Sequence, residues 1–202
     1  MRLATIPLVS LLLCACGAVE TGTAQSSLPA PFDVAIKFVA SGYMGDGAQA
    51  GRVQVRPVAG ENVRPGDTDN MCYKITYQAG GNRWAGVYWL YPPDNWGDKP
   101  GVSVQGATRI TFWAAGAKGG EIVEFKAGGI KGKKYEDSFE TGIGSKPLTK
   151  EWQKFEIPLQ GQKLSMVIGA FAWVATADAN PNGLTFYLDD IRYEGPAPKT
   201  KK

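Results

Sequence analysis

A dense run of aromatic side chains lies between residues 82 and 98, next to short polar residues. The aromatic residues are Trp84, Tyr88, Trp89, Tyr91 and Trp96. Aromatic rings offer flat apolar faces, while Asp and Asn side chains can bond hydroxyl groups. This combination suits the binding of a flat, hydroxyl-rich ligand, and it equally suits a thick aromatic layer in a protein core.

The first part of this stretch is predicted to be a strand with aromatic residues on both faces. Alternation places Ala85, Val87, Trp89 and Tyr91 on one face, and Trp84, Gly86, Tyr88 and Leu90 on the other. Pro92 and Pro93 must end the strand, because neither residue can donate a backbone N–H. Residues 94–98 then form a polar loop that presents Trp96, which makes Trp96 the leading candidate for contact with a ligand.

Composition excludes several kinds of chemistry. The sequence contains no histidine, which excludes His-based triads, His general bases and His metal ligands. The net charge is only +3, and the one dense basic run is residues 199–202, so no nucleic-acid surface is expected. Cys72 is predicted to be a small buried strand residue, since no histidine is present to activate it as a nucleophile.

The first 16 residues have the features of a bacterial targeting segment. Arg2 supplies a positive charge, and the apolar run after it is too short to span a bilayer. Residues 13–16, Leu-Cys-Ala-Cys, resemble a lipobox, in which Cys16 becomes the lipidated first residue of the mature protein. An ordinary signal peptide, cleaved for example near Ala24, is the alternative.

A lipidated Cys16 would anchor the protein to a membrane without spanning it. Gly17 follows the cysteine, and by resemblance to proteobacterial sorting rules this indicates the outer membrane or the cell surface. With Cys14 lost and Cys16 lipidated, Cys72 has no partner, so a disulfide framework is not expected.

The rest of the chain is predicted to hold one all-β domain. Residues 17–31 are predicted to be a flexible tether, 32–195 the domain and 196–202 a basic tail. No segment keeps a helical period for three turns, and short strands alternate with Gly, Pro and Asn turns, which favours an antiparallel β-sandwich. Residues 42–47 and 138–146 are predicted to be loops. The predicted strands are 32–39, 52–56, 71–78, 84–91, 102–104, 108–115, 121–127, 152–159, 164–175 and 184–194, with Pro158 indicating an edge strand.

Three of these strands resemble those of a known fold. Residues 186–194, Phe-Tyr-Leu-Asp-Asp-Ile-Arg-Tyr-Glu, look like the closing strand of the galactose-binding-like jelly rolls, a fold shared by many carbohydrate-binding modules. Residues 151–159 are similar to the "W-x-x-(aromatic)-x-I-x-L" strand of that fold, and residues 108–113 resemble its "L-x-F-W-A" strand. The resemblance covers residues 32–194 in order, but the aromatic stretch does not map onto a known ligand platform residue by residue.

The resemblance implies carbohydrate binding without cleavage, by aromatic stacking supported by polar groups. The candidate ligand-binding residues are Trp96, Trp84, Tyr88, Trp89, Tyr91 and Tyr43, together with Arg83, Asp94, Asn95, Glu124 and Lys126. At most two of the four aromatics from Trp84 to Tyr91 are expected to reach solvent. Trp113, Phe125, Trp152 and Trp173 are expected in the core, because they lie within strand patterns.

A structural calcium ion is also implied by the resemblance, since many modules of this fold bind one. Asp189 and Asp190 would hold it, with Asp33 and Asp46 completing the shell of oxygen ligands.

Two other function classes compete with carbohydrate binding. A glycosidase needs two carboxylates about 5–10 Å apart; Glu121 and Glu124 point to opposite faces of one strand, so no catalytic residue is predicted. The other alternative is a protein-binding or envelope-scaffold module that uses the aromatic patch as its interface. In either case the domain is expected to be monomeric.

Overall fold

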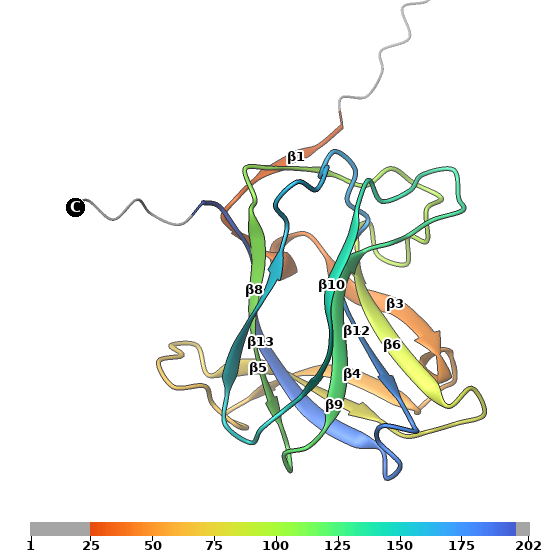
Figure 1. Ribbon diagram of the computed structural model, residues 1–202, viewed down its shortest axis with the longest axis vertical. Coiled ribbons are helices and arrows are strands. Elements are labelled where there is room, and N and C mark those ends of the chain that lie inside the picture. Colours follow the sequence, from red (N-terminus) through yellow and green to blue (C-terminus); the bar gives the residue numbers. More distant parts are fainter. Residues whose placement is uncertain (1–24, 197–202) are drawn as a thin grey trace, which may run out of the picture.

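The computed structural model describes residues 25–196, which form two antiparallel β-sheets packed face to face (Figure 1). Sheet I has the strand order β10-β9-β12-β6-β3, and sheet II has the order β11-β8-β13-β5-β4 with β2 added to β13. The strands are β1 (Ser27–Pro29), β2 (Phe32–Asp33), β3 (Val39–Gly45), β4 (Val53–Ala59), β5 (Met71–Tyr77), β6 (Trp84–Leu90), β7 (Ser103–Gln105), β8 (Arg109–Gly116), β9 (Ile122–Gly128), β10 (Glu140–Pro147), β11 (Gln153–Pro158), β12 (Gly169–Thr176) and β13 (Leu184–Glu194). This arrangement confirms the predicted antiparallel β-sandwich.

Only short 3-10 turns interrupt the strands of the described region. They are η1 (Val34–Ile36) and η2 (Asp46–Ala48). Neither of these helical turns has the length or the apolar character needed to cross a membrane. The predicted signal segment, Cys16 and nearly all of the basic tail lie outside the described residues.

The two ends of the sandwich differ in what they carry. At the top of Figure 1, β1 pairs with β7 in parallel, and the described chain begins there. At the opposite end, η2 and the first residues of β6 lie together. The binding candidates at the start of β6 are therefore far from the end at which the chain enters the domain.

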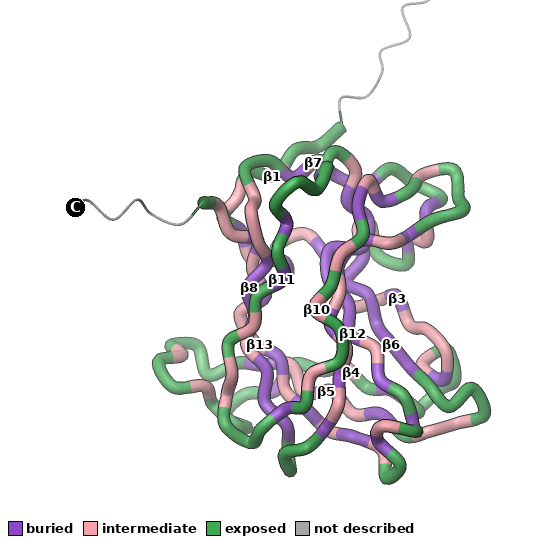
Figure 2. The backbone as a smooth tube through the Cα atoms, viewed as in Figure 1, coloured by how far each residue is buried: buried purple, intermediate pink, exposed green. Residues whose placement is uncertain are grey.

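The core between the sheets is aromatic, and it follows strand alternation. Figure 2 shows buried residues along the strands and exposed residues along the connecting loops. Phe125 lies at the centre, with its ring centroid 4.7 Å from that of Phe112 and 6.1 Å from that of Phe171. Phe125 and Trp173 are fully buried, which confirms their predicted core positions. The other predicted core residues, Trp113 and Trp152, are only partly buried and belong to the outer surface of sheet II.

Strand β6 has the two faces that the sequence predicts. Ala85, Val87 and Trp89 point inward and are 0% exposed, whereas Trp84 on the opposite face is 37% exposed. The strand ends at Leu90, before the two prolines. Strand β11, which contains Pro158, lies at an edge of sheet II, as predicted.

The predicted boundaries are wrong in several places. Residues 27–29, predicted to be part of the tether, form β1, and residues 164–168, predicted to be strand, precede β12. Residues 32–39 do not form one strand, because the Asp33 carboxylate accepts a hydrogen bond from the Ala35 N–H (2.7 Å) and caps η1. The glycine-rich loop predicted at 42–47 is strand up to Gly45. The loop predicted at 138–146 is the edge strand β10, whose register on β9 shifts between Gly142 and Gly144. A bulged, glycine-rich edge strand lacks the alternation used to find strands.

Candidate functional site

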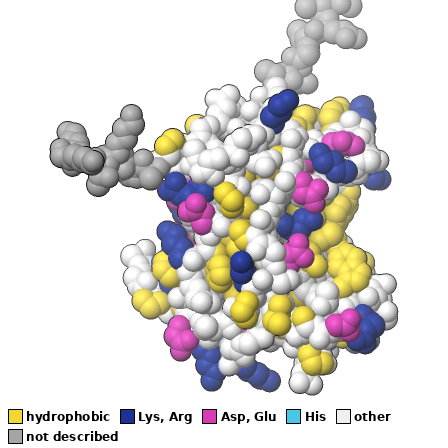
Figure 3. All heavy atoms as spheres, viewed as in Figure 1, with side chains coloured by type: hydrophobic (Ala, Val, Ile, Leu, Met, Phe, Trp, Pro, Cys, Tyr) yellow, Lys and Arg dark blue, Asp and Glu magenta, His cyan; other side chains and the backbone are white. Residues whose placement is uncertain are grey.

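The outer face of sheet I brings Trp84 together with polar side chains from β9 and β10. Strand pairing places Trp84 beside Thr176 of β12, and it places Val174 of β12 beside Glu124 of β9. Hydrophobic side chains gather over β3 and β6 on the right-hand side of Figure 3, with charged groups nearby. We call this surface the Trp84 face and define it by Met44, Trp84, Glu124, Lys126, Glu140 and Val174.

Trp84 is the most exposed aromatic residue within 25–196, at 37%. Its ring lies against Gly45, where an added Cβ would be 2.8 Å from the Trp84 Cδ2 atom and 2.4 Å from the Trp84 carbonyl oxygen. Gly45 also has a φ of 59°, which glycine adopts without strain. The glycine therefore lets the indole lie flat at the end of the sheet.

The floor of the Trp84 face is shallow, because small and slender side chains occupy the row behind Trp84. Gly86 lies between Met44 of β3 and Val174 of β12. A Cβ on Gly86 would be 2.8 Å from the Met44 Cε atom and 3.1 Å from the Val174 Cγ2 atom. The Met44 and Val174 side chains therefore meet over Gly86 and form a flat apolar surface beside Trp84.

The polar side of the face comes from β9 and β10. The Lys126 ammonium donates a hydrogen bond to Glu140 (3.1 Å), and Glu124 points the same way from the same strand. Burial lowers the pKa of Lys126, but Tyr88 and Glu140 outweigh this and raise the pKa above its ordinary value, so Lys126 stays charged. Strand β9 is separated from β6 by β12, which sets the polar groups roughly 10 Å from Trp84.

The far end of the face is closed by Tyr88 and Trp96. Tyr88 is 4% exposed and donates a hydrogen bond from its hydroxyl to the Gly128 carbonyl (2.9 Å). Trp96 is half-buried, with its ring packed edge-on against Tyr88 at 6.1 Å. A Cβ on Gly97 would be 2.5 Å from the Tyr135 carbonyl oxygen, so the loop after β6 packs tightly on the loop around residue 135. Trp96 therefore forms the rim of the face and is not a freely exposed platform.

The buried carboxylate of Asp137 holds this end in place. It accepts hydrogen bonds from the backbone N–H groups of Ile130 (2.9 Å), Ile168 (2.5 Å) and Gly169 (3.2 Å). Burial raises the pKa of Asp137 to about 6, against the opposing effect of these donors and of Lys131. The loop that carries Tyr135 is thereby fixed to the start of β12.

The raised pKa of Asp137 predicts a pH-dependent stability. Between about pH 4 and pH 6 the folded state holds a proton on Asp137 that the unfolded state has released, so the free energy of unfolding falls as the pH rises through this range. We expect this group to contribute a fall on the order of 2 kcal/mol. Urea unfolding from pH 4 to pH 7 should show the fall as a difference in slope between the wild-type protein and Asp137→Asn. Identical slopes would contradict the prediction, whatever the offset between the two curves.

The other sequence-predicted site residues lie away from the Trp84 face. Trp89 is 0% exposed and belongs to the core, so it cannot stack on a surface ligand. Tyr43 of β3 and Tyr91, directly after β6, are half-buried and pack against the core. Arg83 pairs with Asp178 on the exposed turn before β6.

The polar loop after β6 has mainly a structural use. Asn95 is buried; its amide donates to the Tyr91 and Lys99 carbonyls, and its oxygen accepts from the Gly97 and Lys99 N–H groups. Asp94 is exposed, and its N–H donates to the Ser41 hydroxyl (2.9 Å). The structure thus gathers Trp84, Glu124 and Lys126 on one surface, with Tyr88 and Trp96 at its end. Met44, Val174 and Glu140 complete it and were missed, since only strand pairing places them there.

The four aspartates predicted to bind calcium do not assemble into one site. Asp46 is fully buried and accepts hydrogen bonds from the Tyr77 hydroxyl (3.0 Å), the Gly80 N–H (2.7 Å) and the Asn82 N–H (2.8 Å). Its carboxylate thereby ties η2 to the loop before β6. Within residues 25–196, no three His, Cys, Asp or Glu side chains are grouped so that they could hold a metal ion.

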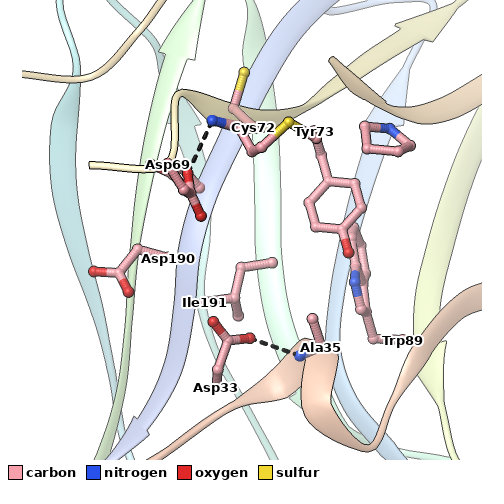
Figure 4. A pocket seen from close by; sticks show the side chains of 11 residues that line it. Asp33, Ala35, Asp69, Cys72, Tyr73, Trp89, Asp190 and Ile191 are labelled. Atoms are coloured by element: carbon pink, nitrogen blue, oxygen red, sulfur yellow. Dashed lines mark hydrogen bonds between the residues drawn. The ribbon is translucent and has the colours of Figure 1, made fainter. Parts of the chain in front are cut away.

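The other three predicted ligands, Asp33, Asp189 and Asp190, line a cavity of about 200 Å³. Asp69 lines it as well (Figure 4). One of these carboxylates already has a cationic partner, because the Arg64 guanidinium donates to the Asp189 carboxylate (2.7 Å) and both side chains are 14% exposed. Cys72 also lines this cavity. It is buried as predicted, and burial raises the pKa of its thiol to about 11, which makes it a poor nucleophile.

We expect Arg64, and not a metal ion, to neutralise this cavity. Adding EDTA should leave the midpoint of thermal unfolding unchanged, whereas Arg64→Met should destabilise the fold by about 1–3 kcal/mol because Asp189 loses its partner. The exposed Arg56→Met is the matched control and should have little effect. A lower midpoint of the wild-type protein in EDTA would contradict this expectation and support the predicted calcium ion.

Comparison with known proteins identifies the fold. No protein-family model and no curated protein matches the sequence. Among solved structures, the chain is similar to a family 11 carbohydrate-binding module from a cellulosomal cellulase of Clostridium thermocellum, at 14% identity and a TM-score of 0.53, over 85% of this chain and 97% of that one. The chain has the β-sandwich jelly-roll fold of carbohydrate-binding modules.

Two further structures have the same fold. A family 30 carbohydrate-binding module aligns at 14% identity and a TM-score of 0.51, over 81% of this chain and 97% of the module. An exo-β-agarase aligns at 10% identity and a TM-score of 0.52, over 83% of this chain but only 25% of the enzyme. The match therefore corresponds to one part of the agarase and not to the whole enzyme.

Proposed function

We propose that the domain binds a carbohydrate chain on the Trp84 face and does not cleave it. The observation that carries the proposal is the exposure of the Trp84 indole on the same sheet face as Glu124 and Lys126. An indole ring can stack on the apolar C–H face of a sugar ring, while a carboxylate and an ammonium group bond its hydroxyls. The fold shared with carbohydrate-binding modules supports this ligand class.

The shape of the face favours an extended ligand. The β12 residues between Trp84 and Glu124 are Thr176 and Val174, whose side chains are small, and the polar groups lie roughly 10 Å from the indole. That distance exceeds one sugar ring, so we infer that the face takes an internal stretch of a chain and not a single terminal unit.

The proposal includes attachment to a bacterial membrane through a lipidated Cys16. It is supported by the sequence Leu13-Cys14-Ala15-Cys16 after an apolar segment. Expression of the full chain in a bacterium should place it in the membrane fraction, and Cys16→Ser should move it to the soluble fraction. A Cys16→Ser protein that stays membrane-bound would contradict the lipid anchor.

Binding is tested with the described domain and a panel of glycans. We expect retention on at least one insoluble polysaccharide among cellulose, agarose and chitin, or retarded migration in gels that contain soluble β-glucan or xylan. Release of reducing sugar from any of these would assign an enzyme instead. Failure to bind every glycan, combined with binding to envelope proteins, would favour the scaffold alternative.

A further inference from the structure

A polar groove of about 720 Å³ lies on the outer face of sheet II, in the layer opposite the Trp84 face. Strands β4, β5 and β13 form its floor, and residues 117–121 and 179–183 form its end. The volume is within the range of about 300–1,000 Å³ that is usual for ligand sites. None of the residues discussed so far as sugar contacts lines it.

The floor consists of two rows of side chains that strand register aligns. Gln54, Thr76 and Thr185 are partners across β4, β5 and β13. In the next row, Lys74 is the register partner of Tyr187. Gln54 is exposed and the two threonines are half-buried, so their amide and hydroxyl groups can be reached from solvent. Such groups both donate and accept hydrogen bonds, as the hydroxyls of a sugar require.

An aromatic wall stands beside the polar floor. Tyr187 lines the groove, and its ring centroid is 6.4 Å from that of Trp152, whose indole N–H donates to the Asn62 carbonyl (2.9 Å). Both rings are half-buried and therefore keep part of their surface in solvent. A row of hydroxyl and amide groups next to fixed aromatic rings is the same pairing of surfaces that suits a sugar chain.

The charge of the groove favours a neutral ligand. The ammonium of Lys74 is neutralised by an ion pair with Glu61 (2.6 Å). Lys118 and Glu121 at the end of the groove have opposite charges, and the Glu121 carboxylate already accepts a hydrogen bond from the Lys118 backbone N–H (2.8 Å). Counting Glu61 with the lining residues, two ammonium groups face two carboxylates, so the groove itself has no net charge to attract phosphate or an acidic polymer. The exposed Arg56, the register partner of Lys74, does not line it.

We propose that this groove is a second carbohydrate-binding site, which takes a neutral glycan segment against Tyr187. This second site rests on the proposed function only in taking the same class of ligand, because it shares no residue with the Trp84 face. Because the two sites lie on opposite outer faces of the sandwich, one domain would hold two glycan chains at the same time and link them.

The experiment uses indole N–H signals, because the chain has six tryptophans that NMR can resolve. Titration with the soluble glycan that binds best should shift the Trp84 signal through the first site and the Trp152 signal through the second. Tyr187→Ala should weaken the Trp152 response at least fivefold and leave the Trp84 response unchanged, and Trp84→Ala should do the reverse. If the Tyr187→Ala protein does not fold, Gln54→Ala is used in its place, because Gln54 is exposed; it should also weaken the Trp152 response and leave the Trp84 response unchanged.

Calorimetry supplies an independent measure of the number of sites. We expect two glycan chains per wild-type domain and one for either single variant. One chain per wild-type domain, lost in Trp84→Ala and kept in Tyr187→Ala, would overturn the second site and leave the proposed function standing. If the wild-type domain binds one chain and only Tyr187→Ala abolishes this binding, the Trp84 face is overturned and the groove stands. If no glycan binds, both sites are overturned.

Discussion

Replacing Trp84 by alanine is expected to weaken glycan binding at the Trp84 face at least tenfold, about 1.4 kcal/mol. The indole is the most exposed aromatic ring of the described residues, and alanine removes its whole stacking surface. Aromatic residues at the centre of binding surfaces commonly contribute 2 kcal/mol or more. The loss is measured by titrating the soluble glycan into two proteins, the Tyr187→Ala variant and the Trp84→Ala/Tyr187→Ala double variant. Tyr187→Ala removes binding at the groove from both, so the difference in affinity reports the Trp84 face.

Stability separates this effect from misfolding. Trp84 is on the outer face, so Trp84→Ala should shift the unfolding midpoint by only a few degrees. Trp113→Ala is the matched control, because this half-buried tryptophan lies on sheet II and does not line the groove. Equal affinity of Trp84→Ala and wild type would refute the role of the indole.

Replacing Phe125 by alanine should have the largest effect on stability, a loss of about 3–5 kcal/mol. The ring is 0% exposed and contacts aromatic rings from both sheets, including Phe112 of β8 at 4.7 Å and Phe171 of β12 at 6.1 Å. The cavity that alanine leaves cannot be filled by rings held on separate strands. Thermal unfolding should move to lower temperature by roughly 10 °C.

The neighbouring residue gives a direct contrast. Glu124→Ala, one position earlier on β9, should change the stability by about 0.5 kcal/mol or less, because its side chain points outward. It should instead reduce glycan affinity, since a hydrogen-bonding carboxylate is lost. If Phe125→Ala were as stable as Glu124→Ala, the inward and outward faces of β9 would be assigned wrongly.

Strand alternation made most of the sheet predictable from the sequence. The inward side of β6 and the burial of Phe125 and Trp173 follow from residues that repeat at every second position. The same rule failed for Trp113, because both faces of that segment carry apolar residues. Alternation then separates the two faces but does not say which one is buried.

The candidate site was harder to predict, because its parts are far apart in the sequence. Trp84 and Val174 lie on one face only because β6 pairs with β12, and no local sequence pattern predicts that pairing. The Arg64–Asp189 ion pair joins positions separated by 125 residues. It gives Asp189 of the last strand a cationic partner that the sequence pattern does not indicate. The exposure of each aromatic side chain also depends on tertiary packing: Trp96 lies in a polar loop, but its ring packs on Tyr88.

The position of β1 has a consequence for how a tethered domain would be displayed. The described chain begins at the end of the sandwich where β1 pairs with β7, and the first residues of β6 lie at the other end (Figure 1). An anchor placed ahead of residue 25 would hold the β1 end close to the lipid and project the indole of Trp84 outward. In that arrangement the membrane would not cover the Trp84 face, and a glycan chain could reach it from the side away from the lipid.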